Sequence, residues 1–320
     1  MANISITSAC NRDCSYCFAR SPATRSMTIA EFDRALDFIQ RSGMDQVRLL
    51  GGEPTLHPDF PRFVDSVLSR GLRLLIFSNG LMPEPAVRCL ESAPADRAAV
   101  LINVAVPGEC RPEEELGQRS TLRRLGRRAT LGLNIYAPTV RPDFLLGLIR
   151  DLGLWPCIRL GLAHCRVDGT NRFLHPRYYR VVGQRLAEFA GAARGEGVAL
   201  EFDCGFVPCM FPPRFLDMAG ITASDIGLRC SPLLDVLPDS RVVSCYPLAG
   251  LHCEPIPEHH DAAWMRKRFE ARFSWLRPAG IFRECADCGL RASGQCAGGC
   301  LAAAMGRLRR APFAVSLPNG

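Results

Sequence analysis

Strand-like and helix-like segments alternate along the first two thirds of this 320-residue chain. Amphipathic helical patterns separate short apolar runs of the kind that form strands. These runs are residues 3–7, 46–50, 72–78, 99–106, 130–136 and 157–163. Strands that alternate with helices in this way form a parallel sheet with right-handed crossovers. The pattern therefore predicts the α/β class, with six strand-helix units.

The ends of several expected elements carry their own signals. Thr28 and Glu31 have the spacing of a capping box at the start of one helix, and Asp59 is the expected N-cap of the next. Residues 176–195 are predicted to form the last helix of this series, and residues 200–203 an edge strand.

The composition limits where the chain works and what its cysteines do. Hydrophobic residues make up 48% of the chain, no run of eighteen apolar residues occurs, and no charged-then-apolar leader opens the sequence. We therefore expect a cytoplasmic protein without a membrane partner. Its 16 cysteines are expected to be metal ligands more than disulfides, because the cytosol keeps thiols reduced. The net charge of +7 includes an arginine-rich segment over residues 119–128, read as a solvated helix face, so a nucleic-acid partner is not expected.

The character of the sequence changes near residue 203. Beyond it the chain is irregular, contains many prolines and is rich in cysteine, which predicts one domain over residues 1–203 and a second over 204–320. Nine thiols in the second part are too many for packing alone. They are Cys204, Cys209, Cys230, Cys245, Cys253, Cys285, Cys288, Cys296 and Cys300.

Three cysteines follow the first strand within one short loop. Cys10, Cys14 and Cys17 can converge on one 4Fe-4S cluster, and three thiolates leave one iron without a protein ligand. One strand later the chain carries Gly51-Gly52-Glu53-Pro54. With Phe18 after the last cysteine, this combination resembles the radical S-adenosylmethionine (radical SAM) superfamily. The resemblance implies a partial (β/α)6 barrel of the TIM type.

The resemblance also implies cofactors and the residues that hold them. SAM would chelate the open iron, and one electron from the cluster would cleave it to a 5'-deoxyadenosyl radical that abstracts hydrogen from a substrate. Backbone near Tyr16 would contact the adenine, and Gly51, Gly52 and Glu53 would meet the amino group of SAM. Three further polar residues are candidate SAM contacts because they end the third, fourth and fifth strands. They are Asn79, Asn103 and Asn134.

The second part of the chain resembles the SPASM or twitch extension of radical SAM enzymes, which holds one or two auxiliary 4Fe-4S clusters. The match rests on Cys230-x14-Cys245 followed by Cys285-xx-Cys288-x7-Cys296-xxx-Cys300. It implies a first cluster on Cys230, Cys245, Cys300 and either Cys204 or Cys209, and a second on Cys285, Cys288 and Cys296. Ser240 stands where the pattern has glycine, and no cysteine follows Cys300. The second cluster therefore takes an earlier ligand such as Cys253, keeps an open iron or is absent, and structural zinc is the competing interpretation.

Three residues near strand ends are candidates for catalysis. Cys165, just past the sixth strand, is a candidate hydrogen-atom donor, with packing as the alternative. Asp203 and His164 are the candidate general bases, with solvated or capping roles as alternatives. Cys89, Cys110 and Cys157 read as small buried hydrophobes.

The first expectation for the function is an oxidoreductase or peptide maturase that oxidises or cross-links a ribosomally synthesised peptide. A radical SAM dehydrogenase acting on a small molecule in antibiotic or cofactor biosynthesis is the alternative, and a non-enzymatic metal-binding module is the third. Since the chain begins nine residues before Cys10, no N-terminal leader-recognition domain is expected. An electron donor such as flavodoxin or ferredoxin is the expected protein partner.

Overall fold

The structure is a computed structural model that describes residues 1–20, 23–212, 215, 230 and 233–309. Within these ranges, ten strands form one curved sheet. They are β1 (Ala2–Ser5), β2 (Gln46–Leu50), β3 (Arg73–Ser78), β4 (Ala98–Asn103), β5 (Ala129–Ile135), β6 (Cys157–Leu162), β7 (Ala199–Phe202), β8 (Asp235–Val236), β9 (Arg241–Val243) and β10 (Glu254–Pro255). The order across the sheet is β10-β9-β8-β1-β2-β3-β4-β5-β6-β7, and β1 to β7 pair in parallel.

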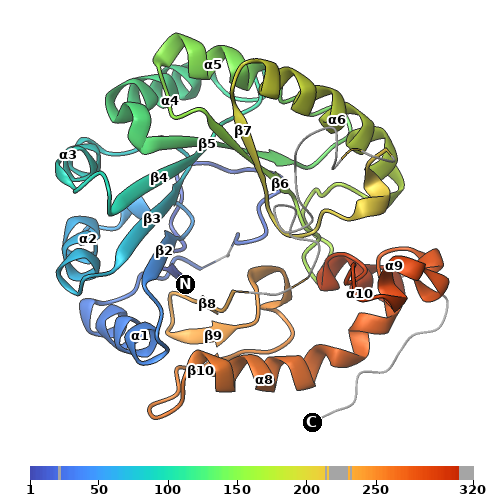
Figure 1. Ribbon diagram of the computed structural model, residues 1–320. Helices are drawn as coiled ribbons and strands as arrows, with labels where there is room; N and C mark the ends of the chain where they lie inside the picture. The colour runs from blue at the N-terminus through green and yellow to red at the C-terminus, as the bar shows by residue number, and fades with distance from the viewer. Residues whose placement is uncertain (21–22, 213–214, 216–229, 231–232, 310–320) are drawn as a thin grey trace.

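Helices cover the outside of this curved sheet, as Figure 1 shows. Those of the first part are α1 (Ile29–Arg41), α2 (Phe60–Ser69), α3 (Glu84–Ser92), α4 (Pro112–Leu125), α5 (Phe144–Leu152) and α6 (Tyr179–Gly195). Their apolar faces pack on the sheet, where Phe32 of α1 and Phe63 of α2 meet with ring centroids 4.4 Å apart. This is the predicted α/β partial barrel, and β7 is the predicted edge strand.

The observed boundaries lie within one residue of the sequence pattern except at the end of β1, the end of β4 and the start of α6, which follows a 3-10 turn over Pro176–Tyr178. Strand β4 ends at Asn103, although the apolar run continues to Val106. The Thr28–Glu31 capping box is confirmed. Asp59 does occupy the N-cap of α2, but its side chain makes no capping bond there. Its carboxylate instead accepts a hydrogen bond from Arg62 at 3.2 Å, because a φ of −89° and ψ of 15° differ from the usual extended cap.

The cysteine-rich part of the chain continues the sheet of the barrel. Strand β8 pairs in parallel with β1, so that Asp235 lies opposite Asn3, and β9 and β10 follow antiparallel. The helices of this part, at the lower side of Figure 1, are α8 (Ala262–Phe273), α9 (Gly289–Ala292) and α10 (Leu301–Arg309). The two parts share one sheet, and the domain boundary near residue 203 stays a prediction. Residues 310–320 of the predicted second domain lie outside the described part.

The turn between β8 and β9 contains a strained residue. Ser240 has a φ of 63°, and among the described residues it is the one non-glycine with a positive φ. Its N–H donates to the Leu237 carbonyl at 3.0 Å, which closes the turn. The position that carries serine in place of the pattern's glycine therefore still adopts the left-handed conformation that glycine favours.

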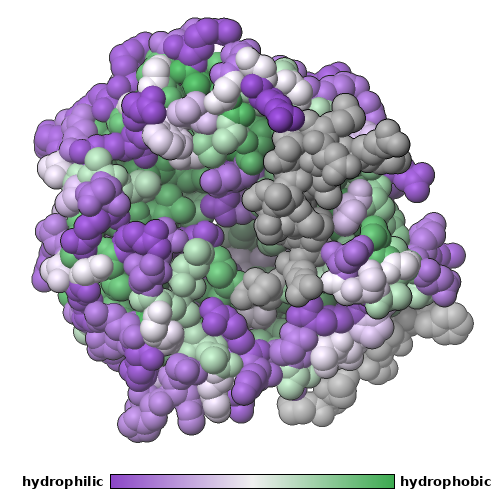
Figure 2. Space-filling view, viewed as in Figure 1, coloured by the Kyte–Doolittle hydropathy of each residue, from purple (hydrophilic) through white to green (hydrophobic). Residues whose placement is uncertain are grey.

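The outer surface is polar over most of the face seen in Figure 2, and a hollow opens near its centre. Over the arginine-rich segment, Arg124 of α4 forms ion pairs with Glu84 and Glu91 of α3 at 2.5 and 2.6 Å. None of the helices in the described ranges is both long enough and apolar enough to cross a membrane.

Candidate functional site

The three-cysteine loop leaves β1 at the end of the barrel where the parallel strands terminate, which is where barrel proteins place their sites. The Cys17 N–H donates to the Cys14 carbonyl at 3.0 Å, which folds the loop back on itself. Burial raises the pKa of Cys17, and the neighbouring charges of Cys14 and Cys10 raise it further. The three predicted cluster ligands therefore lie within electrostatic reach of one another, as a shared cluster requires.

The Gly51-Gly52 pair packs directly against the backbone of this loop. The Gly52 N–H donates to the Thr7 carbonyl and the Glu53 N–H to the Ala9 carbonyl, both at 2.8 Å. A Cβ atom on Gly51 would lie 2.5 Å from the Thr7 carbonyl oxygen, and one on Gly52 would lie 2.3 Å from that of Ala9. Only glycine permits this approach, so the pair fixes the cysteine loop whatever else it contacts.

The Glu53 side chain is fully buried and its oxygens are already engaged. They accept hydrogen bonds from the Thr55 hydroxyl at 2.6 Å, the Ser78 hydroxyl at 2.9 Å and the Asn79 N–H at 2.7 Å. Burial raises the pKa of Glu53, while these donors lower it. The carboxylate ties the ends of β2 and β3 together, and its predicted contact with SAM stays a prediction.

Asn79 links this buried carboxylate to the cysteine loop. Its side-chain amide donates to Asn11 Oδ1 at 2.8 Å and approaches Cys10 Sγ at 3.7 Å. The Arg12 N–H also points at Cys10 Sγ, at 3.4 Å. Two N–H donors therefore face the sulfur of Cys10, which suits a thiolate ligand.

The other two predicted asparagines stand side by side inside the barrel. Asn134 Nδ2 and Asn103 Oδ1 are 3.4 Å apart. Glycines on the neighbouring strands leave room for them. A Cβ on Gly132 would lie 2.6 Å from Asn103 Oδ1, and one on Gly161 would lie 2.9 Å from Asn134 Oδ1. The structure thus brings Asn103 and Asn134 to one place, and their contact with SAM stays a prediction.

Tyr16 lies under an aromatic and cationic stack. Its ring is parallel to that of Tyr136, with centroids 4.6 Å apart, and the Arg172 guanidinium lies 5.1 Å from the Tyr136 centroid. The Tyr16 carbonyl accepts a hydrogen bond from Asn171 at 3.0 Å. The cysteine loop is therefore held from β5 and from the segment after β6.

Two predicted catalytic residues have clear surroundings. Asp203 forms an ion pair with Arg159, whose guanidinium lies 4.8 Å from the centre of the Phe77 ring inside the barrel. Cys165 is buried, donates to the Arg166 carbonyl at 3.0 Å and lies close to Gly306 of α10. Asp203 is therefore part of the barrel interior, and Cys165 packs against the second part of the chain. Their catalytic roles stay predictions.

Two thiols of the second part, Cys204 and Cys300, contact the ring of His164. The Nε2 atom of His164 lies 3.7 Å from Cys204 Sγ. Burial raises the pKa of Cys245, and the charges of Cys300, Cys230 and Cys204 contribute to the rise. Burial disfavours ionisation of Cys300, but the charge of His164 and N–H groups at the start of α10 lower its pKa to about 7.

The Cys285–Cys300 segment is organised by glycines and one arginine. The Gly298 N–H donates to Cys296 Sγ at 3.3 Å, and a Cβ on Gly280 would lie 2.7 Å from Cys285 Sγ. Arg291 donates to the carbonyls of Cys285 and Arg277, at 2.9 Å each. These contacts suit thiolates held in a compact loop, as an iron-sulfur cluster would need.

Cys253 lies elsewhere, near the β9–β10 turn, and its sulfur accepts a hydrogen bond from Arg241 at 2.9 Å. In the described ranges no three His, Cys, Asp or Glu side chains stand close enough to share a single metal ion. The thiolates of a 4Fe-4S cluster surround a cube of several atoms and stand farther apart than the ligands of one ion.

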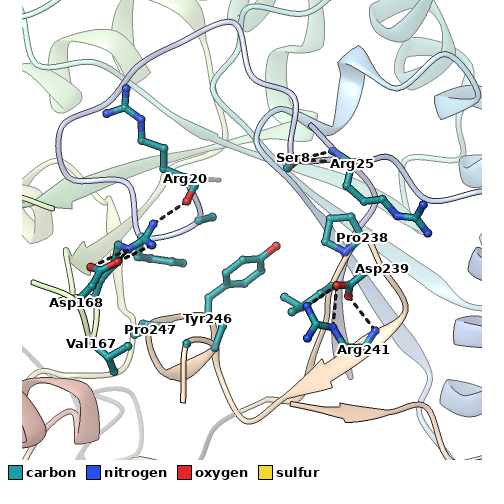
Figure 3. Close-up of a pocket in the computed structure, with 16 residues that line it drawn as sticks. Ser8, Arg20, Arg25, Val167, Asp168, Pro238, Asp239, Arg241, Tyr246 and Pro247 are labelled. Atoms are coloured by element: carbon teal, nitrogen blue, oxygen red, sulfur yellow. Dashed lines mark hydrogen bonds and ion pairs between the residues drawn. The ribbon is translucent and has the colours of Figure 1, made fainter. Parts of the chain in front are cut away.

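A cavity of about 510 Å³ opens between the cysteine loop, the segment after β6 and the β8–β9 turn (Figure 3). Tyr246 points into its middle, between Asp168 on one side and Arg241 on the other. Ion pairs within the wall join Arg166 to Asp168 and Arg241 to Asp239. The cavity therefore has a polar wall beside the cluster loop and is large enough for part of a substrate.

Several residues of the site were not singled out from the sequence. Ser78 and Thr55 donate hydrogen bonds to Glu53, and Arg159 forms an ion pair with Asp203. Ser78 directly precedes Asn79 at a strand end, which is a usable signal. Thr55 lies two residues after Glu53 and is also a local signal, whereas Arg159 reaches Asp203 from another strand, so local sequence contains no sign of that pair.

Comparison with known proteins agrees with this geometry. Residues 4–131 match the profile described as the radical SAM superfamily. An S-adenosylmethionine-dependent nucleotide dehydratase of Selenomonas ruminantium is 28% identical over 179 residues, which cover 50% of this chain and 65% of that protein. GTP 3',8-cyclase 1 of Mycobacterium tuberculosis is 29% identical over 115 residues, 32% of each chain. The chain spans less than two thirds of the length of these curated relatives.

Among solved structures, Streptococcus suis SuiB bound to S-adenosylmethionine has a TM-score of 0.70 at 14% identity. The likeness covers 93% of this chain and 72% of that one. SuiB bound to the precursor peptide SuiA gives a TM-score of 0.69 at 14% identity, with 93% and 71% covered. At this identity the likeness establishes the fold, including that of the cysteine-rich part.

Proposed function

We propose, because this chain belongs to the radical SAM superfamily, that it binds SAM at a 4Fe-4S cluster on Cys10, Cys14 and Cys17 and abstracts hydrogen from a substrate. The observation that carries the proposal is the interlock of the cysteine loop with Gly51 and Gly52, through the N–H···O bonds to Thr7 and Ala9. When bound, the cluster and SAM supply a radical able to attack carbon that no side chain can activate.

The residues of this chain hold and orient those groups. Asn79 and the Arg12 N–H face the sulfur of Cys10, and the stack on Tyr136 fixes Tyr16 beside the expected adenine site. Asn103 and Asn134 offer amide groups from neighbouring strands, where ribose or carboxylate oxygens of SAM can be bound. Asp203 is the proposed general base and Cys165 the proposed hydrogen-atom donor.

A peptide is the first candidate substrate, which makes the protein an oxidoreductase or peptide maturase. The fold shared with SuiB, a protein solved in complex with its precursor peptide, supports this choice. The 510 Å³ cavity beside the cluster loop also supports it, because the wall joins the barrel to the second part of the chain and presents paired charges. A peptide backbone and its side chains can use both signs of charge.

A small anionic molecule such as a nucleotide is the second candidate. The printed activities of two relatives, a nucleotide dehydratase and a GTP cyclase, favour it. The cavity wall also includes Arg20 and Arg25, whose guanidinium groups can bind phosphate groups. The third interpretation, a metal-binding module without catalysis, does not account for the glycines packed on a three-thiol loop.

The second part is proposed to hold auxiliary 4Fe-4S clusters of the SPASM or twitch kind, and a flavodoxin or ferredoxin is the proposed electron donor. The support is the convergence of thiols around His164 and the N–H groups that face Cys296 and Cys300.

The proposal is tested by anaerobic reduction of the reconstituted protein with dithionite in the presence of SAM. We expect 5'-deoxyadenosine to form in the wild-type protein, and its absence would overturn the proposal. GTP and the other nucleoside triphosphates are then added in parallel with a synthetic peptide encoded by a short reading frame beside the gene. The substrate class is the one that raises the rate and acquires a changed mass.

A further inference from the structure

Cys204 and Cys209 lie five positions apart but face different thiol groups. Between them Phe206 and Val207 are almost completely buried, and Met210 and Phe211 follow as buried residues. This buried segment is pinned to α6, since a Cβ on Gly183 would overlap the Met210 carbonyl. Cys204 precedes this segment and Cys209 lies within it, and both cysteines are exposed.

Cys204 belongs with the thiols around His164. Its sulfur lies 3.7 Å from His164 Nε2, and the same imidazole is hydrogen-bonded to Cys300. Cys230 lines a cavity together with Ser244 and Leu301, which are the sequence neighbours of Cys245 and Cys300. These four cysteines form a complete set of ligands for one cluster without Cys209.

Cys209 belongs with the other group. The next residue, Met210, packs on Gly183, which lies about one turn beyond Tyr179 at the start of α6. Cys209 is an exposed cysteine in a run of buried side chains, although free cysteine is among the most buried residue types. The Tyr179 ring packs edge-on against Phe282, just before the Cys285 turn, and this contact brings α6 and the Cys285 segment together.

We propose that Cys209 is the fourth ligand of the second auxiliary cluster, with Cys285, Cys288 and Cys296, and that Cys204 completes the first with Cys230, Cys245 and Cys300. The two clusters are then both fully ligated, although no cysteine follows Cys300. Cys253 is left out of both sets because it lies just before β10, where its sulfur contacts Arg241 and not the thiols of either group. The assignment rests on the proposed iron-sulfur function of the second part of the chain.

The test uses the full chain with Cys10, Cys14 and Cys17 replaced by alanine, so that loop-bound iron is absent. This background, reconstituted without oxygen, is expected to hold roughly eight irons per chain in two 4Fe-4S clusters. Adding Cys209→Ala should remove roughly four of them or leave a three-iron cluster visible by electron paramagnetic resonance. The matched control Cys253→Ala should leave the iron content and Mössbauer spectrum unchanged.

Combination of variants identifies the cluster to which Cys209 belongs. Cys209→Ala added to Cys288→Ala should cause no further loss of iron, whereas Cys209→Ala added to Cys230→Ala and Cys245→Ala should remove nearly all that remains. The opposite pattern would overturn the assignment, as would loss of iron in the Cys253 control. A background that binds no iron, or only zinc, would also overturn it. Circular dichroism checks that each variant is folded.

These outcomes are separate from those of the proposed function. The iron content is measured in a protein that lacks the loop cysteines, while SAM cleavage is measured in the wild-type protein. Failure of SAM cleavage with eight auxiliary irons present would reject the function and keep the ligand assignment.

Discussion

The Glu53 carboxylate accepts the backbone N–H of Asn79 at 2.7 Å, which joins the turn after β2 to the end of β3 beneath the cysteine loop. Asn79 carries the connection onward, because its side-chain amide lies 3.7 Å from Cys10 Sγ. Glu53, a predicted SAM contact, is therefore also the buried support of the predicted cluster ligand Cys10, through Asn79.

Replacing Glu53 with glutamine is expected to weaken both the fold and SAM binding. The glutamine NH2 group would face hydrogen-bond donors, since Thr55, Ser78 and Asn79 all donate to this side chain. Leaving buried donors unsatisfied costs about 1 to 3 kcal/mol. Urea unfolding and equilibrium dialysis with SAM measure the two effects. Glu31→Gln, in the exposed capping box of α1, should cost stability but leave SAM affinity unchanged. Equal SAM affinity in Glu53→Gln and wild type would refute the prediction.

Cys10, Cys14 and Cys17, replaced together with alanine, are expected to abolish 5'-deoxyadenosine formation while the barrel still folds. Without its three thiolate ligands, the loop should not hold a cluster that SAM can chelate. Liquid chromatography of the products and circular dichroism measure the two properties. Cys89→Ala, on helix α3, is the control and should retain full SAM cleavage. Unchanged cleavage in the triple variant would contradict the assignment.

Gly52→Ala is expected to displace the cysteine loop. The new Cβ would lie 2.3 Å from the Ala9 carbonyl oxygen, and relieving such overpacking typically costs about 1 to 3 kcal/mol. Both the unfolding free energy and the iron bound by the loop should fall. Gly191→Ala is the matched control, because no described heavy atom lies within 4 Å of the Cβ position there. That helical substitution should stabilise the protein by about 0.5 to 1 kcal/mol. A Gly52→Ala protein as stable as wild type would show that the loop adapts.

Ser240→Gly is expected to stabilise the protein by about 1 kcal/mol. Ser240 adopts a φ of 63°, and its buried hydroxyl has no hydrogen-bond partner among the described residues. Glycine removes both costs. The same substitution at Ser92, near the end of α3, should destabilise by about 0.5 to 1 kcal/mol because glycine disfavours the helix. Urea unfolding of both variants measures the opposite signs, and a loss of stability in Ser240→Gly would contradict the conformational argument.

Asp235→Asn is expected to remove a pH-dependent loss of stability. Burial raises the pKa of Asp235 from 3.8 to about 7, although Asn3 and the Tyr246 N–H donate to it. A folded-state pKa above the unfolded value means that the folded protein binds the proton more tightly, so stability falls as pH rises through this window. Between pH 5 and pH 8 the wild-type protein should lose about 3 kcal/mol relative to the variant. Urea unfolding of both proteins at several pH values measures the difference, and parallel curves would refute the shift.

The order of elements and the cluster loop followed from local sequence. Strand β2 lies at residues 46–50 as expected, and the Thr28–Glu31 capping box starts α1. These features depend on residues only a few positions apart, so the local sequence is enough to predict them. Asp59 shows the limit of this reasoning, because the backbone geometry at the start of α2 turned its carboxylate to Arg62.

The sequence by itself determined the α/β class, the three-thiol loop and the presence of enough cysteines for further clusters. Only the tertiary structure distinguished Cys204 from Cys209, which lie five positions apart in the sequence, because Phe206 and Val207 are buried between them and Cys204 lies beside His164. Only it showed that β8 pairs with β1, bringing Asp235 opposite Asn3 across more than two hundred residues of chain. Local propensity reaches a few residues, whereas burial and pairing join distant segments whose contacts leave no local pattern.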